Sequence, residues 1–401
     1  SYDKESGELV LHNYMDFDNL KDYVKISYEL TQDGLLIGKG KLAEVSVVPH
    51  SEGKTDLKVN VQENGKCYLK LIYHLKKEMP LLEENHILGF DEIEVSQKDA
   101  KCQLAEKWLE KTATDSELQV NEDDTQIHIK GREFAYTIDR RTALFTEMKF
   151  AGREYLNHPM ELNIWRAPTD NDMYIKAEWK KAHYDKAYTR AYTTEVVQGK
   201  HGVKIVSHAS VVAETVQKIL DVTITWKIDA SGKIDADIEA AKDREFPDLP
   251  RFGVRMFLDK KLSDARYFGM GPQESYRDKH QAASHGLYRA NVRDLHEDYI
   301  RPQENGSHYD CGYVELNNSR YGMAAFSEST FSFNASYYTQ EELEKKTHNY
   351  ELAESDSVVL CVDYALNGIG SNSCGPVVLD QYRFNDVLFR FQFTLVPYVK
   401  G

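Results

Sequence analysis

Alternation of apolar and polar residues dominates this sequence and constrains its fold more than any other feature. A period of two places successive side chains on opposite faces of a strand, so each alternating stretch predicts a half-buried β-strand. The clearest examples are residues 24–30, 68–75, 127–129, 134–138, 222–228, 234–238 and 389–395. The sequence therefore predicts an all-β protein.

The first part of the chain contains short, closely spaced strand patterns. Residues 24–30 are followed by the turn Asp33-Gly34 and by residues 35–42, which predicts a hairpin. Residues 57–61 and 68–75 are separated by a second glycine-containing turn and predict another. About seven short strands of this kind indicate a small antiparallel sandwich of immunoglobulin-like size, which we place at residues 1–97.

A polar segment at residues 98–124 interrupts the alternation, and we expect it to be a linker. Alternation then returns over residues 125–401, with few helical patterns. One such pattern covers residues 173–187, and Thr339 begins a capping box. These residues contain more strands than a single sheet layer holds. The sequence therefore predicts a large antiparallel two-sheet sandwich after the linker.

Composition excludes several classes of partner. The 401 residues include 50 Lys and Arg against 65 Asp and Glu, which gives a net charge of −15. Because no basic patch opposes this charge, we expect no nucleic acid as partner. We also expect no membrane, since no apolar run approaches the roughly 20 residues of a membrane helix.

The five cysteines lack the paired spacing of a zinc site or a redox pair, which favours a reducing compartment. We therefore expect a cytoplasmic location. The sequence begins SYDKE, with neither an initiator Met nor a signal segment, so we expect a piece of a longer chain.

Loop-forming segments hold the residues that could carry chemistry. Asp170-Asn171-Asp172 is a compact turn former, and Arg166 is placed to pair with it. Residues 368–376 combine three Gly with a Pro, so this loop can approach another surface closely. Nothing basic lies beside Cys374 in the sequence, so its thiol has no visible activation as a nucleophile.

Four such segments, in this order, resemble the carboxy-terminal region of β-galactosidases of glycoside hydrolase family 2. They are Arg166-Ala167-Pro168-Thr169-Asp170-Asn171-Asp172, Gly269-Met270-Gly271-Pro272-Gln273-Glu274-Ser275-Tyr276, Pro302-Gln303-Glu304-Asn305-Gly306 and the loop of residues 368–376. The resemblance implies an immunoglobulin-like domain at residues 1–97. It also implies a β-galactosidase small chain domain at residues 125–401, an antiparallel supersandwich similar to galactose mutarotases.

The resemblance also implies a function. The full enzyme would hydrolyse terminal non-reducing β-D-galactose residues of lactose-type substrates with retention. Both catalytic glutamates would lie in a TIM barrel outside these residues, so no catalytic residue is expected here, and the chain alone would be inactive. This region would support assembly and wall the galactose pocket through Asn372, Ser373 and Cys374. Some family members have a Trp at the position of Cys374.

The same resemblance names the partners and cofactors. The expected partners are a galactoside, the catalytic barrel or a large subunit and, for the full-length enzyme, further copies of itself. Family members often need Mg and a monovalent cation at sites mainly in the other domains, so no cofactor is expected in this region.

Two other functions stay open. A stand-alone carbohydrate-binding module would keep an exposed Trp or Tyr platform and would bind sugar without a partner. A mutarotase-like epimerase would use an acid/base pair in the cleft of the sandwich, although no His and Glu in matching motifs identify such a pair.

Overall fold

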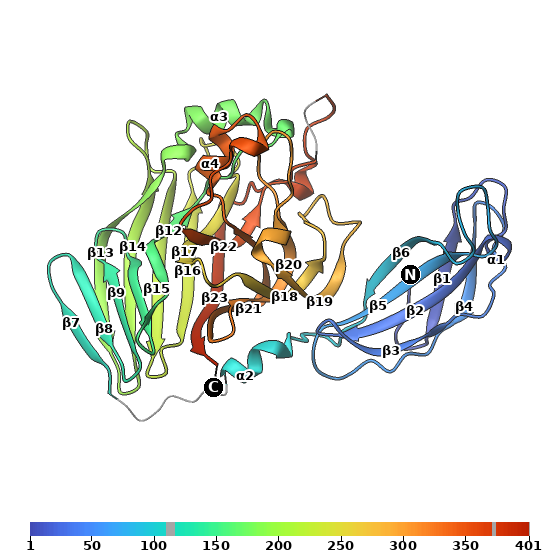
Figure 1. Ribbon diagram of the computed structural model, residues 1–401, viewed down its shortest axis with the longest axis horizontal. Helices are drawn as coiled ribbons and strands as arrows, with labels where there is room; N and C mark the ends of the chain where they lie inside the picture. Colours follow the sequence, from blue (N-terminus) through green and yellow to red (C-terminus); the bar gives the residue numbers. More distant parts are fainter. Residues whose placement is uncertain (110–116, 371–373, 401) are drawn as a thin grey trace. The chain divides into compact units, whose positions relative to one another are not determined.

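The computed structural model describes residues 1–109, 117–370 and 374–400, which form two compact units (Figure 1). One unit comprises Ser1–Leu104 with His285–Leu287, and the other comprises Ala105–Ser284 with Tyr288–Gly401. The linker expected at residues 98–124 includes residues 110–116, which lie outside the described residues. Its described part contains η1 (Gln103–Ala105), α2 (Glu106–Leu109) and β7 (Gln119–Glu122). The predicted domain boundaries stay a prediction.

The smaller unit is a sandwich of two antiparallel sheets. Its six strands are β1 (Glu8–Asn13), β2 (Val24–Gln32), β3 (Leu35–Lys41), β4 (Ser51–Asp56), β5 (Cys67–Leu75) and β6 (Ile87–Glu94), with one short helix, α1 (Leu20–Tyr23). One sheet pairs β1 with β4, and the other has the order β3-β2-β5-β6. The predicted β2–β3 hairpin is confirmed, and Asp33 and Gly34 both have positive φ, as a tight hairpin turn requires.

The prediction of one strand in this unit is wrong. Residues 57–61 form no strand, and β4 ends just before them. Val59 and Val61 do pack against the core, so the alternation reports a buried face correctly. The backbone N–H of Leu57 donates to Gly7 O at 2.8 Å, outside any strand ladder. The segment therefore covers the core without joining a sheet.

The larger unit consists of a five-stranded sheet packed against a twelve-stranded one. The smaller sheet has the order β11-β10-β9-β8-β7, and the larger has the main order β12-β17-β22-β21-β23-β16-β15-β14-β13, with β18, β19 and β20 off this path. Beyond β7, the strands are β8 (Gln126–Lys130), β9 (Phe134–Asp139), β10 (Leu144–Phe150), β11 (Arg153–Glu154), β12 (Leu156–Asn163), β13 (Tyr188–Gln198), β14 (Gly202–Val212), β15 (Leu220–Asp229) and β16 (Ile234–Lys242). They continue with β17 (Arg251–Asp259), β18 (Asp264–Gly271), β19 (Ser284–Asn291), β20 (Ser307–Asn317), β21 (Tyr321–Ser336), β22 (Ser357–Leu366) and β23 (Leu388–Val399). The all-β sandwich expected from the sequence is confirmed.

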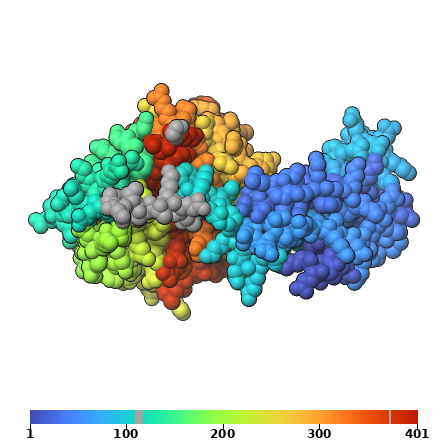
Figure 2. Space-filling view, turned by 90° about the horizontal axis from the view of Figure 1, so that it is seen from below, coloured from blue at the N-terminus to red at the C-terminus, as the bar shows by residue number. Residues whose placement is uncertain are grey.

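Aromatic side chains fill the space between the two sheets. Trp226 from β15 meets Phe145 from β10 edge to face, with ring centroids 4.9 Å apart. The indole N–H of Trp226 donates to Ala143 O at 2.8 Å, so the large ring is buried with its polar group satisfied. In the large sheet, β16 pairs with β23, and this pairing joins the consecutive strands β13 to β16 to the rest of the sheet. In Figure 2, red atoms of the C-terminal part lie beside the yellow-green atoms of the middle strands.

Helices are short in this unit. The helix predicted over residues 173–187 is broken into α3 (Ile175–Lys181) and the 3₁₀ turn η3 (Tyr184–Lys186), because His183 has a left-handed φ of 59°. The predicted cap at Thr339 is confirmed, since its hydroxyl accepts a hydrogen bond from the Glu342 N–H at the start of α4 (Gln340–Lys345). No helix among the described residues is long and apolar enough to cross a membrane.

Candidate functional site

The sequence segments singled out above converge at one place in the larger unit. The N–H of Glu304 donates to Ala167 O at 3.0 Å, and the N–H of Asp170 donates to the Gln303 side chain at 3.1 Å. The N–H of Gly306 donates to Glu274 Oε2 at 2.9 Å, which joins the second segment to the third. Segments that lie more than a hundred residues apart in the sequence are therefore hydrogen-bonded to one another.

Arg166 joins the first segment to the fourth. Its guanidinium is fully buried and forms a bidentate pair with Asp172, with Nη2–Oδ1 and Nε–Oδ2 distances of 2.7 and 3.1 Å. Its remaining donors bind Asn367 O at 2.5 Å and Gly368 O at 3.1 Å. A buried charge requires such complete pairing. The expected pair of Arg166 with the Asp-Asn-Asp turn is thus present, and the same side chain holds the start of the loop at residues 368–376.

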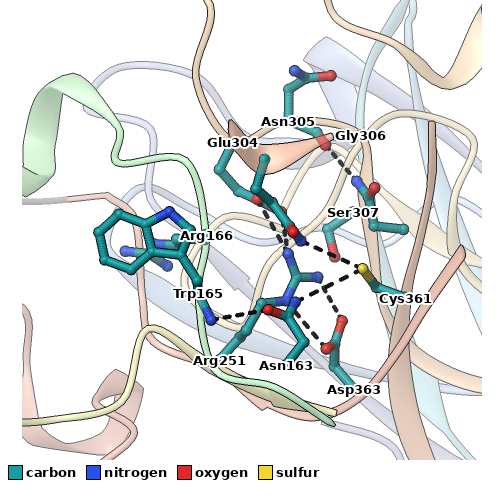
Figure 3. Close-up of polar contacts among 12 residues, drawn as sticks. Asn163, Trp165, Arg166, Arg251, Glu304, Asn305, Gly306, Ser307, Cys361 and Asp363 are labelled. Atoms are coloured by element: carbon teal, nitrogen blue, oxygen red, sulfur yellow. Dashed lines mark hydrogen bonds and ion pairs between the residues drawn. The ribbon is translucent and has the colours of Figure 1, made fainter. Parts of the chain in front are cut away.

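A second buried cation, Arg251 at the start of β17, lies between two carboxylates (Figure 3). It binds Asp363 of β22 through Nη2–Oδ2 and Nε–Oδ1 at 2.6 and 3.1 Å, and it binds Glu304 through Nη1 at 3.2 Å. Burial raises the pKa of the Glu304 carboxyl, and the positive charge of Arg251 opposes that shift. The same two effects, in the same order, act on the pKa of Asp363.

Sequence reasoning missed Arg251 and Asp363. Asp363 is the one charged residue of β22, which is otherwise almost entirely apolar, whereas β17 carries Arg251 together with Arg255 and Asp259. The isolated charge in β22 is the signal that could have identified Asp363. Their pairing depends on the contact between β17 and β22, which are about a hundred residues apart in the sequence.

These carboxylates are not arranged for glycoside hydrolysis. Such chemistry needs two carboxyl groups that reach the sugar, one of them free to give or take a proton. Glu304 and Asp363 are 3% and 0% exposed, and Arg251 binds both. This cluster is therefore a buried ion-pair network that links β17, β22 and the third segment.

A histidine close to Glu304 in the sequence is equally inaccessible. His308 follows the third segment and is 1% exposed, and its Nδ1 lies 3.2 Å from Met270 O. Burial lowers the pKa of His308 to about 4. An aldose cannot reach this ring, so His308 with Glu304 does not form the acid/base pair that an epimerase requires.

The predicted sugar-contacting residues are only partly described. Asn372 and Ser373 lie outside the described residues, and Cys374 is exposed at the surface of the larger unit. Cys67, Cys311 and Cys361 are buried, which raises their thiol pKa values. Contact of the loop with a sugar stays a prediction.

A cavity of about 190 Å³ adjoins the site. Its walls combine aromatic rings with charged side chains, including Tyr276, Arg277, Tyr309, Tyr364 and Asp386. Tyr276 also packs with Leu366 and Ile369, so one side chain belongs to both the cavity and the base of the loop. Within the described ranges, no three His, Cys, Asp or Glu side chains are grouped so that they could hold a metal ion.

Comparison with known proteins gives consistent matches along the chain. A family model described as "Beta galactosidase small chain" matches residues 130–395, and one described as "Beta-galactosidase, domain 4" matches residues 9–96. A β-galactosidase of Actinobacillus pleuropneumoniae is 41% identical over 390 residues, covering 97% of this chain and 38% of that protein. A β-galactosidase of Staphylococcus xylosus is 31% identical over 398 residues, covering 98% of this chain and 39% of that protein. The chain thus spans about two fifths of the length of these relatives.

Among solved structures, a galactose 1-epimerase from Lactobacillus acidophilus aligns with a TM-score of 0.38 at 9% identity, covering 72% of this chain and 100% of that chain. A likeness at this level carries no argument about function.

Proposed function

Because the chain belongs to the β-galactosidase small chain family, we propose that it supports assembly of a β-galactosidase and forms one wall of its galactose pocket. The resemblance to the carboxy-terminal region of β-galactosidases is confirmed by the matches over both units. The full enzyme would hydrolyse terminal non-reducing β-D-galactose residues, as in lactose-type substrates. The catalytic glutamates would come from a barrel outside these 401 residues.

One observation carries the proposal. Arg166 binds the carbonyl oxygens of residues 367 and 368, so the backbone that leads to Asn372, Ser373 and Cys374 starts from a buried, fully paired group. Loops that contact ligands from a rigid scaffold are the usual position of binding residues. These three residues are our candidates for galactose contact.

The proposal also concerns partners and location. The full-length enzyme would bind a galactoside, the catalytic barrel or a large subunit, and further copies of itself. Mg and a monovalent cation would bind mainly in the other domains. The unpaired spacing of the cysteines supports a reducing compartment, and we propose the cytoplasm.

The test replaces Asn372, Ser373 and Cys374 together by Ala in the full-length enzyme. We expect KM for an aryl β-galactoside to rise several-fold because the replaced side chains would contact the sugar. Lys200→Ala, in the exposed turn between β13 and β14, is the control and should leave KM unchanged. An unchanged KM in the triple variant would contradict the proposal.

The binding-module alternative has its own test. Titration of this chain alone with galactose in a calorimeter should give no heat of binding, because one wall of a pocket does not enclose a sugar. Saturable binding with a stoichiometry of about one would favour a stand-alone module.

A further inference from the structure

The smaller unit contains a cavity of about 520 Å³ that the proposed function does not use. Part of its wall is aliphatic and comes from α1, β2 and the segment after β3, namely Leu20, Val24, Ile26, Leu42 and Val45. Cavities of this size and character commonly hold small apolar ligands. The wall also includes Ser27 of β2, His74 of β5 and Asn85. The cavity thus combines room for an aliphatic group with side chains that can carry chemistry.

Ser27 and His74 form a hydrogen-bonded pair in this wall. The Ser27 Oγ and His74 Nε2 atoms are 2.8 Å apart, and His74 Nδ1 lies 3.4 Å from the Asn85 carbonyl oxygen. Because a carbonyl oxygen only accepts, Nδ1 carries the ring proton in this arrangement and Nε2 is left as an acceptor. The Ser27 hydroxyl therefore donates to Nε2. A hydroxyl, a base and a group that orients the base are the three parts that activate a serine.

The backbone supports all three groups. Ser27 and His74 lie on adjacent strands, because β2 pairs with β5 in the four-stranded sheet. The Asn85 N–H donates to Leu75 O at 2.8 Å, which ties residue 85 to the last residue of β5. Side chains on strands hold their positions more precisely than side chains on loops. The hydroxyl and the imidazole are therefore positioned before any ligand binds.

A positive charge lies beside the serine. Lys41, at the end of β3, is the cross-strand partner of Ser27, so the two side chains project from the same face of the sheet. Lys41 also lines the cavity, whereas Lys25 on the same face is paired with Glu84. Cationic groups that face a developing oxyanion stabilise the transition state of acyl transfer. Lys41 is thus the candidate for that role.

We propose that the chain has a second activity at Ser27 and His74, the hydrolysis of carboxylic esters with a short aliphatic acyl group. Ser27 Oγ attacks the ester carbonyl carbon while its proton passes to His74 Nε2. The bond to the alcohol oxygen then breaks, and this oxygen takes the proton from Nε2. Water, losing a proton to the same nitrogen, attacks the acyl-serine. The Ser27 oxygen leaves and recovers that proton, and the carboxylic acid is released.

Esters, and not amides, are the expected substrates. In serine hydrolases with a full triad, a carboxylate stabilises the imidazolium that forms on the base. The neutral carbonyl of Asn85 provides less stabilisation, so the site suits a substrate whose leaving group needs little assistance. The aliphatic wall receives the acyl chain, which favours butyrate over a charged acyl group.

The experiment measures release of nitrophenol from p-nitrophenyl butyrate by this chain. We expect hydrolysis faster than that by an equal concentration of free histidine. Ser27→Ala and His74→Gln should each lower the rate on the order of a hundredfold, because a positioned general base contributes at least this much. Lys41→Gln should also lower the rate, because it removes the charge beside the oxyanion.

A matched control uses a similar pair in the larger unit. His208 Nδ1 lies 3.2 Å from the Thr223 hydroxyl, and both residues lie outside the cavity. His208→Gln should hydrolyse the ester at the wild-type rate. A thermal melt of each variant shows whether it is folded, and if Ser27→Ala does not fold, His74→Gln carries the same test.

Covalent labelling gives a readout that does not depend on turnover. A fluorophosphonate loses fluoride to an activated serine hydroxyl, so peptide mass spectrometry should find the adduct on Ser27. Labelling of Ser27 should be slower in His74→Gln and unchanged in His208→Gln. Ester hydrolysis that persists in folded Ser27→Ala overturns the proposal, and so does an unlabelled Ser27 or a rate no higher than that of free histidine. These results are independent of galactoside binding, which the variants of residues 372–374 test.

Discussion

Arg251 and Asp363 form a bidentate ion pair, with an Nη2–Oδ2 distance of 2.6 Å and no exposed surface on either side chain. Because Glu304 binds the same guanidinium, one buried cation neutralises two carboxylates that belong to different parts of the sandwich. The stability of the larger unit and the shape of the site thus depend on the same group.

Removal of that cation should be costly. Arg251→Met leaves two buried carboxylates without their partner, so we expect the free energy of unfolding of the larger unit to fall by about 3–5 kcal/mol. Arg390→Ala removes a cation from Asp237 at an exposed position and should lower the free energy of unfolding far less. Denaturant titration of both variants tests the comparison, and similar small losses would contradict it.

Acid should destabilise the larger unit through His308. Its pKa is lowered to about 4 in the folded protein, whereas an unfolded histidine titrates near 6.5, so the unfolded state binds more protons between these values. Stability is therefore fully present above pH about 6.5 and falls as the pH drops toward 4. His308→Gln should flatten this part of the stability profile, while His208→Gln, at an exposed position, should leave it unchanged. An equally steep profile in His308→Gln would refute the assignment.

The chain alone should not hydrolyse aryl β-galactosides above background. Glu304 and Asp363 are buried and paired, and the proposed catalytic carboxylates lie outside these residues. Release of nitrophenol from a nitrophenyl β-galactoside measures this directly. Turnover by purified, sequence-verified chain would show that a catalytic pair had been overlooked.

Limited proteolysis should cut first within residues 98–124. That segment interrupts the alternation, and each flanking region has its own hydrophobic core. We expect a stable fragment of about 280 residues, identified by mass spectrometry and N-terminal sequencing. Early cleavage elsewhere without such a fragment would reject the predicted boundary.

Substitution of Cys374 should have a small effect in the full-length enzyme. A thiol offers little area for sugar contact, so Cys374→Ala should change KM only modestly and leave unfolding of this unit unaffected. Deletion of residues 371–375 should impair substrate binding more strongly. Complete loss of activity in folded Cys374→Ala enzyme would instead indicate a nucleophilic thiol.

Local patterns predicted much of this fold. Alternation identified β2, β5, β15, β16 and β23, because a half-buried strand shows its exposed and buried faces directly in the sequence. The same pattern was misleading at residues 57–61, where it marks a buried face without a neighbouring strand. Whether a segment finds a hydrogen-bonding partner depends on distant residues, and periodicity carries no information about them.

The site was predictable only in outline. The first and third segments were recognised as loops, whereas the second begins inside β18, and the pair formed by Arg166 was anticipated from Asp170-Asn171-Asp172. The roles of Arg251 and Asp363 were not, because each depends on contacts between segments that only the tertiary structure brings together. A charged residue in an apolar strand indicates a buried pair, but it does not identify the partner.

Arg166 and Asn171 donate hydrogen bonds to the carbonyl oxygens of residues 367–369, and Asp278 accepts hydrogen bonds from the N–H groups of residues 369 and 370. These side chains bind only main-chain atoms of residues 367–370, and every amino acid supplies a carbonyl oxygen. These hydrogen bonds consequently do not depend on which side chains follow in the loop. Residues 371–375 can therefore be exchanged in a library while Arg166, Asn171 and Asp278 stay constant. If the loop contacts the sugar as we propose, such a library is expected to contain variants with altered sugar preference.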